Sequence, residues 1–307
     1  MTKTAWVFPG QGSQALGMGI DLLDIPFAKD KFAQAEEILG WSVTKICQNE
    51  EAKLSQTLYT QPSLYVIESI LADLLRERGH QPDLVAGHSL GEYSALYIAG
   101  VFEWSAGLYL VKRRAELMDS AVGGMMAALM NFDREQLEKV ISQTPDVVLA
   151  NDNSSAQVVI SGTTEAVQAV MTQVKAKRAI PLKVSGAFHS HLIAPAAAEF
   201  QDILDSVEFQ PATVPVLSNV EPIPSIDAEI LKERLNKQMT GSVRWREISL
   251  QLPANGIQQV MEIGPGKVLT GLIKRSSPDL ILKNIQSAAD LPNRIQEEVV
   301  RSWGLPK

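Results

Sequence analysis

The stretch LVAGHSLGEYSAL, residues 84–96, decides the fold. Residues 83–87 are expected to form a short buried strand, since apolar and small side chains follow Asp83, and a helical pattern follows from Leu90 to Ala99 before Gly100 ends it. A strand that passes directly into a helix is the βα unit of a parallel sheet. The stretch therefore predicts an α/β protein with a parallel central sheet.

The same alternation of strands and helices flanks this stretch on both sides. The spacing of apolar residues predicts a helix that Pro62 opens and Gly79 closes, and another helix over residues 105–121. Further strands of the same sheet are expected at residues 5–8, 214–220, 258–263 and 280–285.

Between these halves of the chain the pattern changes to four short strands and two helices. Asp133 and Thr163 are expected to cap the helices, and the polar run of residues 151–155 to form a turn between strands. The order β-α-β-β-α-β is that of a ferredoxin-like unit. The expected strands of this unit are residues 125–130, 147–150, 157–160 and 180–184.

The βα alternation resumes after this unit, so the unit is predicted to be an insertion. A chain of 307 residues is longer than one average domain, which favours a large domain with a smaller insert. We assign residues 1–123 and 190–307 to the large unit and residues 124–189 to the ferredoxin-like insert.

Composition excludes several classes of protein. With 45% hydrophobic and 21% charged residues the chain is expected to be globular, and its net charge of −7 argues against a nucleic-acid partner. No apolar run reaches the ~18 residues of a membrane span. The single cysteine, Cys47, cannot form an internal disulfide. We expect a soluble protein of the cytoplasm, or of a comparable compartment such as a plastid stroma, without membrane contact.

The turn after the decisive strand carries the first candidate catalytic residue. Gly87-x-Ser89-x-Gly91 between a strand and a helix is the pattern of a nucleophile elbow, in which the serine is exposed and the following helix offers free N–H groups to an oxyanion. The alternative is a serine in an ordinary βα turn. The strand on one side and the helix on the other favour covalent acyl chemistry at Ser89.

A serine nucleophile needs a base, and the chain contains four histidines. His80 follows a helix end in a polar loop, and His88 adjoins Ser89 in the sequence, so its side chain is expected to point away from the hydroxyl. His189 and His191 remain, at the junction of the insert and the large unit, where binding sites are frequent. Spacing alone leaves both of them open.

Arg114 stands in an apolar stripe of its predicted helix. An arginine in such a stripe must be paired, because an isolated buried charge is very costly. One interpretation is an internal ion pair. The other is a guanidinium that waits for a substrate carboxylate, which it can bind through two hydrogen bonds. Its helical neighbours are Leu110, Val111, Leu117 and Met118.

Two glycine-rich turns follow predicted strands at residues 9–14 and 264–267. The first lacks the Lys-Ser/Thr end of a P-loop, and its Gly10-x-Gly12 lacks the third glycine of a dinucleotide site. Both turns are expected at the same carboxyl edge of the sheet as Ser89, where ligands of parallel sheets bind.

Taken together, these pieces closely resemble the malonyl-CoA:acyl-carrier-protein transacylases of bacterial-type fatty-acid synthesis, over essentially the whole chain. The order and spacing of the pieces are far more specific than any one of them. The matching residues are 8–14 (FPGQGSQ), 59–62 (YTQP), 87–93 (GHSLGEY), Arg114, 186–190 (GAFHS) and 264–267 (GPGK).

The resemblance implies an α/β-hydrolase-like large domain with a ferredoxin-like insert. It implies that His189 is the base and that a main-chain carbonyl, matched here by Gln238, orients its imidazole. It further implies that the backbone N–H groups of Gln11 and Leu90 form the oxyanion hole for the attack by Ser89.

The resemblance also implies how the substrate is selected. Arg114 is expected to bind the malonyl carboxylate, and His88 to be a neighbour in the pocket. Related extender-loading domains of polyketide synthases distinguish malonyl from methylmalonyl partly at the two positions that correspond to Leu90 and Phe188. Leu and Phe are the residues associated with malonyl there, because a bulky Phe crowds the α-carbon of methylmalonyl. His191 departs from the family pattern and is expected to be a bystander.

The expected reaction transfers a malonyl group from malonyl-CoA to Ser89 and then from the malonyl-serine to the thiol of holo acyl-carrier protein. We expect the enzyme to need no metal or redox cofactor and to be a monomer. A serine hydrolase or thioesterase, a stand-alone polyketide-type extender acyltransferase and an inactive scaffold are the alternatives. Carrier proteins are acidic, so basic side chains are candidates for docking. These are Lys175, Lys177, Arg178, Lys274 and Arg275.

Overall fold

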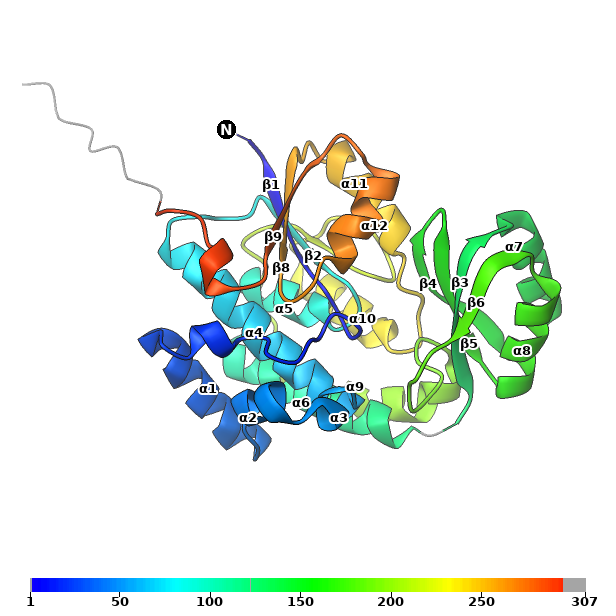
Figure 1. Cartoon of the computed structure of the whole chain (residues 1–307), viewed down its shortest axis with the longest axis horizontal. Coiled ribbons are helices and arrows are strands. Elements are labelled where there is room, and N and C mark those ends of the chain that lie inside the picture. Colours follow the sequence, from blue (N-terminus) through cyan, green and yellow to red (C-terminus); the bar gives the residue numbers. More distant parts are fainter. Residues whose placement is uncertain (1, 122, 295–307) are drawn as a thin grey trace, which may run out of the picture.

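The computed structural model describes residues 2–121 and 123–294, which form a large α/β unit and a smaller unit beside it (Figure 1). Residues 295–307, which the sequence analysis assigned to the large unit, lie outside the described residues, as do residues 1 and 122. The large unit contains a five-stranded sheet in the order β7-β2-β1-β8-β9, and every strand pair in it is parallel. This confirms the predicted α/β class with a parallel sheet. Its strands are β1 (Thr4–Phe8), β2 (Leu84–Gly87), β7 (Val216–Leu217), β8 (Gln259–Ile263) and β9 (Ile281–Ile285).

Helices cover both faces of this sheet because its central strand is apolar on both sides. In β1, Trp6 and Phe8 belong to one hydrophobic core, whereas Ala5 and Val7 belong to another on the opposite face. The first core is built with α1 (Pro26–Leu39), α2 (Val43–Asn49), α3 (Glu51–Leu54), α4 (Thr57–Glu77), α5 (Gly91–Ile98), α6 (Trp104–Ser120), α9 (Ala194–Asp205) and α10 (Ala228–Gln238). The second is built with α11 (Trp245–Ala254) and α12 (Val268–Ser276). Short 3₁₀ turns are η1 (Ile20–Leu22), η2 (His191–Ile193) and η3 (Ala288–Asp290).

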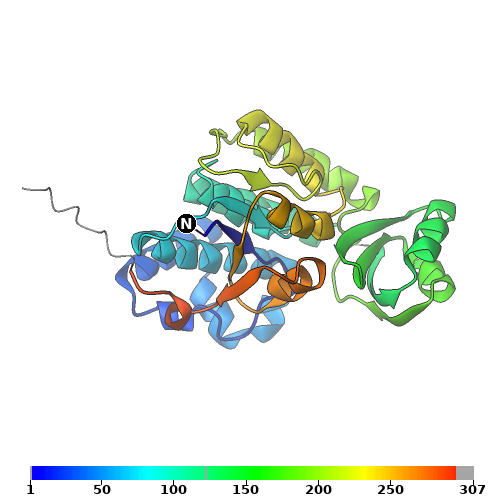
Figure 2. The ribbon, with the colours of Figure 1, turned by 90° about the horizontal axis from the view of Figure 1, so that it is seen from above.

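The smaller unit is an antiparallel four-stranded sheet in the order β4-β5-β3-β6. It lies at one end of the molecule in both views (Figures 1 and 2). Two helices pack on one face of the sheet, and Met126, Ala150 and Val159 of the other face join the core of the large unit. Its elements are β3 (Met125–Phe132), α7 (Arg134–Gln143), β4 (Val147–Ser154), β5 (Gln157–Gly162), α8 (Thr164–Gln173) and β6 (Ala176–Pro181).

The predicted caps of the two small-unit helices are confirmed. The Asp133 side chain accepts a hydrogen bond from the Gln136 N–H, and the Thr163 hydroxyl accepts one from the Ala166 N–H. Both contacts join residues three apart, so they depend on local sequence alone.

The predicted turn at residues 151–155 is wrong for residues 151–154, because β4 continues to Ser154 and the turn lies at residues 155–156. Bulges interrupt the register there, and Asp152 N–H donates to the Val243 carbonyl of the large unit. Polar side chains of the segment bind residues outside their own strand. Asp152 forms ion pairs with Arg134 and Arg246, and Asn153 forms a hydrogen bond with His88. These distant partners allow a polar segment to remain extended.

Other boundaries also differ from the prediction. Helix α4 begins at Thr57, five residues before Pro62, and the N–H groups of Tyr59 and Thr60 donate to the Gln56 carbonyl in its first turn. The last strand of the small unit is 176–181, not 180–184, since its charged residues occupy an edge of the sheet, where charge is tolerated.

Strand β7 is shorter than expected. It spans Val216–Leu217 in place of residues 214–220. The chain leaves the sheet after Leu217, and Asn219 turns toward the loop that carries Ser89. No helix in residues 2–121 or 123–294 is both long and apolar enough to cross a membrane.

Candidate active site

Ser89 occupies the sharp turn between β2 and α5. Its backbone is in the left-handed region, with φ of 51°. A Cβ atom on Gly87 would lie 1.9 Å from the carbonyl of Gly91, and one on Gly91 would lie 2.0 Å from the Phe8 carbonyl oxygen. The turn therefore requires glycine on both sides of the serine, as the elbow pattern predicts.

His189 lies against this serine, and His191 does not. The distance from His189 Nε2 to Ser89 Oγ is 2.9 Å. His191 has a half-exposed side chain 3.2 Å from Asp146, on the outside of the molecule. Of the two histidines that spacing left open, the fold brings only His189 to Ser89.

Main-chain carbonyls hold the other edge of the imidazole. His189 Nδ1 is 2.9 Å from the Gln238 carbonyl oxygen and 3.1 Å from that of Gly241. A carbonyl can only accept, so Nδ1 carries the proton and Nε2 presents a lone pair to Ser89. No ion pair between His189 and a carboxylate occurs among the described residues.

The charge state of this imidazole follows from its surroundings. Burial and the nearby Arg114 guanidinium both disfavour a second positive charge, and they lower the pKa of His189 to about 3. The imidazole is therefore neutral at neutral pH, with the lone pair of Nε2 directed at Ser89 Oγ.

Arg114 of α6 is fully buried and points at the same serine. Its guanidinium donates to Gln61 Oε1 at 2.6 Å, to Gln238 Oε1 at 3.0 Å and to Ser89 Oγ at 3.1 Å. It forms no ion pair with a carboxylate in the described part of the chain, and its Nε atom has no partner there. The internal ion pair that the sequence left open is not observed.

The remaining predicted residues lie around the same atoms. Gln11, Leu90 and Phe188 line the pocket that contains Ser89, and within the described residues no acceptor takes the backbone N–H of Gln11 or Leu90. His88 faces away from the serine hydroxyl: its Nε2 is 2.8 Å from Asn153 Oδ1, and its ring lies 5.6 Å from that of Trp245.

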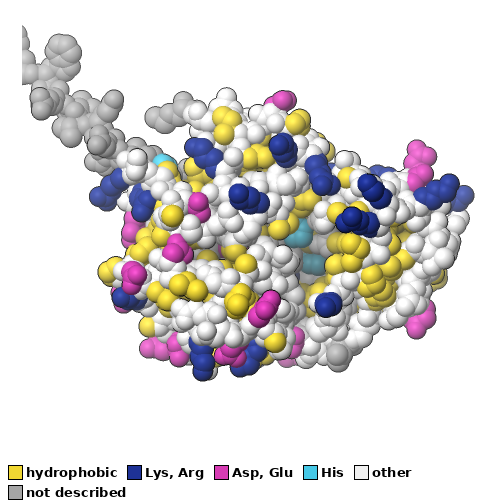
Figure 3. Space-filling model, viewed as in Figure 1, with side chains coloured by type: hydrophobic (Ala, Val, Ile, Leu, Met, Phe, Trp, Pro, Cys, Tyr) yellow, Lys and Arg dark blue, Asp and Glu magenta, His cyan; other side chains and the backbone are white. Residues whose placement is uncertain are grey.

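These side chains open into a pocket of about 410 Å³ between the two units. Met126, Asn153 and Leu182 of the small unit and its C-terminal connection line one side of it. On the space-filling surface, histidine side chains are visible in a hollow with Lys and Arg side chains around it, and hydrophobic side chains cover the adjacent face of the small unit (Figure 3).

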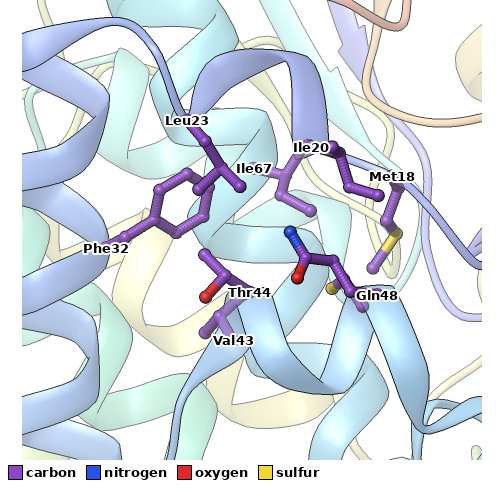
Figure 4. Close-up of a pocket in the computed structure, with 10 residues that line it drawn as sticks. Met18, Ile20, Leu23, Phe32, Val43, Thr44, Gln48 and Ile67 are labelled. Atoms are coloured by element: carbon purple, nitrogen blue, oxygen red, sulfur yellow. The ribbon is translucent and has the colours of Figure 1, made fainter.

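A second gap lies in the large unit, where Phe32, Val43 and Ile67 surround it (Figure 4). It has no room for a water molecule. Cys47 lies beside it, and burial raises the pKa of this thiol to about 11, so the thiol is neutral and packs as an apolar side chain. Among the described residues no group of three or more His, Cys, Asp or Glu side chains could hold a metal ion.

Sequence reasoning missed three side chains at this site. Gln61 binds Arg114, Asn219 binds the backbone of Ser89, and Glu92 joins Asn219 to Gln238. Glu92 lies in the quoted stretch, where it follows Ser89 by one helical turn, and that position was an available signal. The sequence around Asn219 gives none.

Comparison with known proteins places this arrangement in a family. The model of the acyl transferase domain matches residues 5–299. The chain belongs to the malonyl-CoA-acyl carrier protein transacylase family. A curated transacylase of this name from Synechocystis is 62% identical over 289 residues, which cover 94% of this chain and 99% of the relative.

Solved structures of transacylases have the same fold. The crystal structure of the Synechocystis malonyl-CoA:ACP transacylase superimposes with a TM-score of 0.93, at 62% identity, over 94% of this chain and 99% of that one. A malonyl-transacylase in complex with its type II polyketide synthase acyl-carrier protein gives a TM-score of 0.89 at 38% identity, over 94% and 98% of the two chains.

Proposed function

We propose that this protein transfers the malonyl group of malonyl-CoA to the phosphopantetheine thiol of holo acyl-carrier protein, and so supplies fatty-acid chain elongation. The observation that carries the proposal is the position of the buried Arg114 guanidinium, which pairs with no carboxylate in residues 2–121 and 123–294, against Ser89 Oγ, itself 2.9 Å from His189 Nε2. A nucleophile and base perform acyl transfer, and a buried cation beside them selects an acyl group that bears a carboxylate.

In the first half of the reaction, Ser89 attacks the thioester of malonyl-CoA. His189 Nε2 takes the hydroxyl proton as the C–O bond forms, and the Gln238 and Gly241 carbonyls stabilise the imidazolium through Nδ1–H. In this site a pair of main-chain carbonyls takes the place of the carboxylate of a usual triad.

The tetrahedral intermediate carries a negative oxygen. In our proposal this oxygen is bound by the backbone N–H groups of Gln11 and Leu90, which have no acceptor among the described residues and line the same pocket as Ser89. Collapse of the intermediate breaks the C–S bond, and the imidazolium returns its proton to the CoA thiolate.

The second half repeats the chemistry in reverse order. His189 deprotonates the phosphopantetheine thiol, the sulfur attacks the malonyl-serine ester, and the Ser89 alkoxide that leaves takes back the proton. The reaction is a ping-pong exchange with one covalent intermediate.

Substrate choice is assigned to two residues. Arg114 binds the malonyl carboxylate, and the bulk of Phe188, which is buried at the pocket wall, disfavours a branched α-carbon. Gln61 and Gln238 are both neutral, so they hold the guanidinium in place without satisfying its charge.

We further propose that the large unit is α/β-hydrolase-like. The small unit, residues 124–189, is in this proposal a ferredoxin-like insert between residues 1–123 and 190–307. The sheet order β4-β5-β3-β6 with two helices on one face supports the second description.

For its partners we propose malonyl-CoA and an acidic carrier protein, which docks on Lys175, Lys177 and Arg178 of the small unit and on Lys274 and Arg275 of α12. All five side chains are exposed. We further propose a cytoplasmic monomer that binds neither nucleic acid nor membrane.

Incubation of the purified protein with malonyl-CoA tests the function. We expect a stable mass increase of one malonyl group on Ser89, which disappears when holo carrier protein is added and reappears on the carrier. Release of free malonate without a thiol acceptor would indicate a hydrolase instead. Equal labelling by methylmalonyl-CoA would favour a polyketide-type extender acyltransferase.

A further inference from the structure

Two buried side-chain amides hold the strained backbone of the nucleophile. Ser89 N–H donates to Asn219 Oδ1 at 2.7 Å, and the Ser89 carbonyl accepts from Gln238 Nε2 at 2.7 Å. Asn219 also donates from Nδ2 to the Gly87 carbonyl at 2.6 Å. A backbone carbonyl can only accept a hydrogen bond and a backbone N–H can only donate one. These contacts therefore determine which end of each side-chain amide is the oxygen and which is the NH₂ group.

Both amide residues meet on one carboxylate oxygen. Glu92 Oε2 accepts from Gln238 Nε2 at 2.8 Å and from the backbone N–H of Asn219 at 3.2 Å. Glu92 is 1% exposed, and its Oε1 atom has no partner among the described residues. One side chain of α5 thus ties together two segments that are far apart in the sequence.

Gln238 connects this carboxylate to the whole site. Its main-chain carbonyl orients His189, and its side-chain Oε1 accepts from Arg114. Any shift of the Gln238 side chain therefore moves a contact of the nucleophile and a contact of the guanidinium together.

From these contacts we propose that Glu92 is a positioning residue, which fixes Ser89 Oγ relative to His189 through the amides of Gln238 and Asn219. The inference rests on the proposed function. Glu92 makes no hydrogen bond to the hydroxyl or the imidazole, so its hydrogen-bonded connection to the nucleophile passes through those two residues. The burial of a carboxylate costs free energy that an apolar residue would not cost, which argues against a role in packing alone.

Three variants of Glu92 distinguish the effect of its hydrogen-bond acceptor from the effect of its side-chain volume. Glu92→Gln keeps one acceptor oxygen, and its NH₂ can take the place of the unpartnered Oε1. Glu92→Leu removes the acceptor. Glu92→Asp keeps a carboxylate on a side chain that is shorter by one methylene. If Glu92→Leu does not fold, Glu92→Asp tests the proposal in its place.

Glu68 supplies a matched control. It is also fully buried, its Oε2 accepts from Ser94 of the same helix α5, and its Oε1 is likewise without a partner among the described residues. It makes no hydrogen bond to Ser89, Asn219 or Gln238. Glu68→Leu therefore removes a comparable buried carboxylate and leaves the nucleophile turn intact.

The measurement is single-turnover formation of malonyl-Ser89 from malonyl-CoA, followed by intact mass. For Glu92→Leu we expect a maximal rate about 100-fold lower, since small displacements of reacting groups cost this much. The malonyl-CoA concentration at half-maximal rate should change less than about threefold, because Arg114 keeps Gln61. Glu92→Asp should lose at least about 10-fold, and Glu92→Gln and Glu68→Leu less than about threefold.

The opposite results would overturn the inference. Glu92→Leu or Glu92→Asp at the wild-type rate would show that the carboxylate does not position the serine, and a Glu92→Gln as slow as Glu92→Leu would exclude the acceptor role. A loss in Glu92→Leu no larger than in Glu68→Leu would indicate a general effect of burial. A wild-type protein that malonyl-CoA does not label would overturn the proposed function itself.

Discussion

Arg114 Nη2 donates a hydrogen bond to Ser89 Oγ at 3.1 Å. A guanidinium this close to the nucleophile can bind only a carboxylate that lies close to the carbonyl under attack. In malonyl, a single methylene separates these two groups. We therefore propose that the contact selects not only the charge of the acyl group but also its length.

The first prediction concerns this contact. Arg114→Ala should lower acylation by malonyl-CoA about 100-fold in kcat/KM, because loss of one partner of a buried charge pair costs several kcal/mol, and it should abolish the preference for malonyl over acetyl. Labelling of Ser89 by each thioester measures both. Arg113→Ala is the control, since Arg113 pairs with Glu116 outside the pocket. A preference retained in Arg114→Ala would refute the carboxylate-binding role.

The second prediction concerns pH. Burial and Arg114 lower the pKa of His189 to about 3, so the base stays neutral far below the ordinary value of 6.5. The rate of Ser89 acylation should therefore show no half-loss near pH 6.5 and should fall only in strongly acidic solution. A rate profile between pH 5 and 8 measures this, and a midpoint near 6.5 would contradict it.

The same lowered pKa affects stability in a defined direction. The unfolded chain binds a proton at His189 below pH 6.5, whereas the folded chain does not until about pH 3. The contribution is fully present above pH 6.5 and is lost as the pH falls from 6.5 toward 3. His189→Gln should therefore make the free energy of unfolding less dependent on pH in this window, as urea titrations can show. An unchanged slope would argue against the shift.

The fourth prediction concerns carrier-protein docking. Reversal of charge at Lys175 and Arg178, which are exposed on and beside the edge strand β6, should raise KM for the acidic carrier several-fold and leave malonyl-Ser89 formation unchanged. Lys29→Glu with Lys45→Glu makes the same change of net charge on α1 and α2 and serves as the control. An unchanged KM in the first pair would exclude this docking surface.

The last prediction concerns the attachment of the small unit. Asp152 of β4 binds Arg134 of its own unit at 2.8 Å and Arg246 of α11 at 2.9 Å. Asp152→Ala should lower the free energy of unfolding by about 2 kcal/mol, because two arginines lose a buried partner. Thermal unfolding measures this, and Glu233→Ala in the exposed pair with Lys237 should have almost no effect. Equal stability of both variants would contradict the prediction.

Features that depend on neighbouring residues were predictable from the sequence. The βα unit around Ser89 follows from apolar periodicity, its two flanking glycines follow from the sharpness of the turn, and the caps at Asp133 and Thr163 reach only three residues along the chain. The apolar stripe around Arg114 also indicated that its charge needed a special partner.

Features that depend on distant segments could not be predicted in this way. The polar residues of β4 are extended because Val243 and two arginines satisfy them, and no local pattern encodes those partners. The amide of Asn219 meets Ser89 across 130 positions of the chain.

The choice of base shows the same division. The amino-acid sequence alone narrowed the base to two histidines two residues apart, His189 and His191, because residue type and position are local properties. The family resemblance pointed to His189, and the folded chain brings only His189 to Ser89. The backbone at His189 turns through a left-handed φ of 57°, and the carbonyl of Gln238 then holds its imidazole against Ser89 while His191 remains outside. A hydrogen bond between segments exists only after packing has brought them together, so its geometry belongs to the tertiary structure.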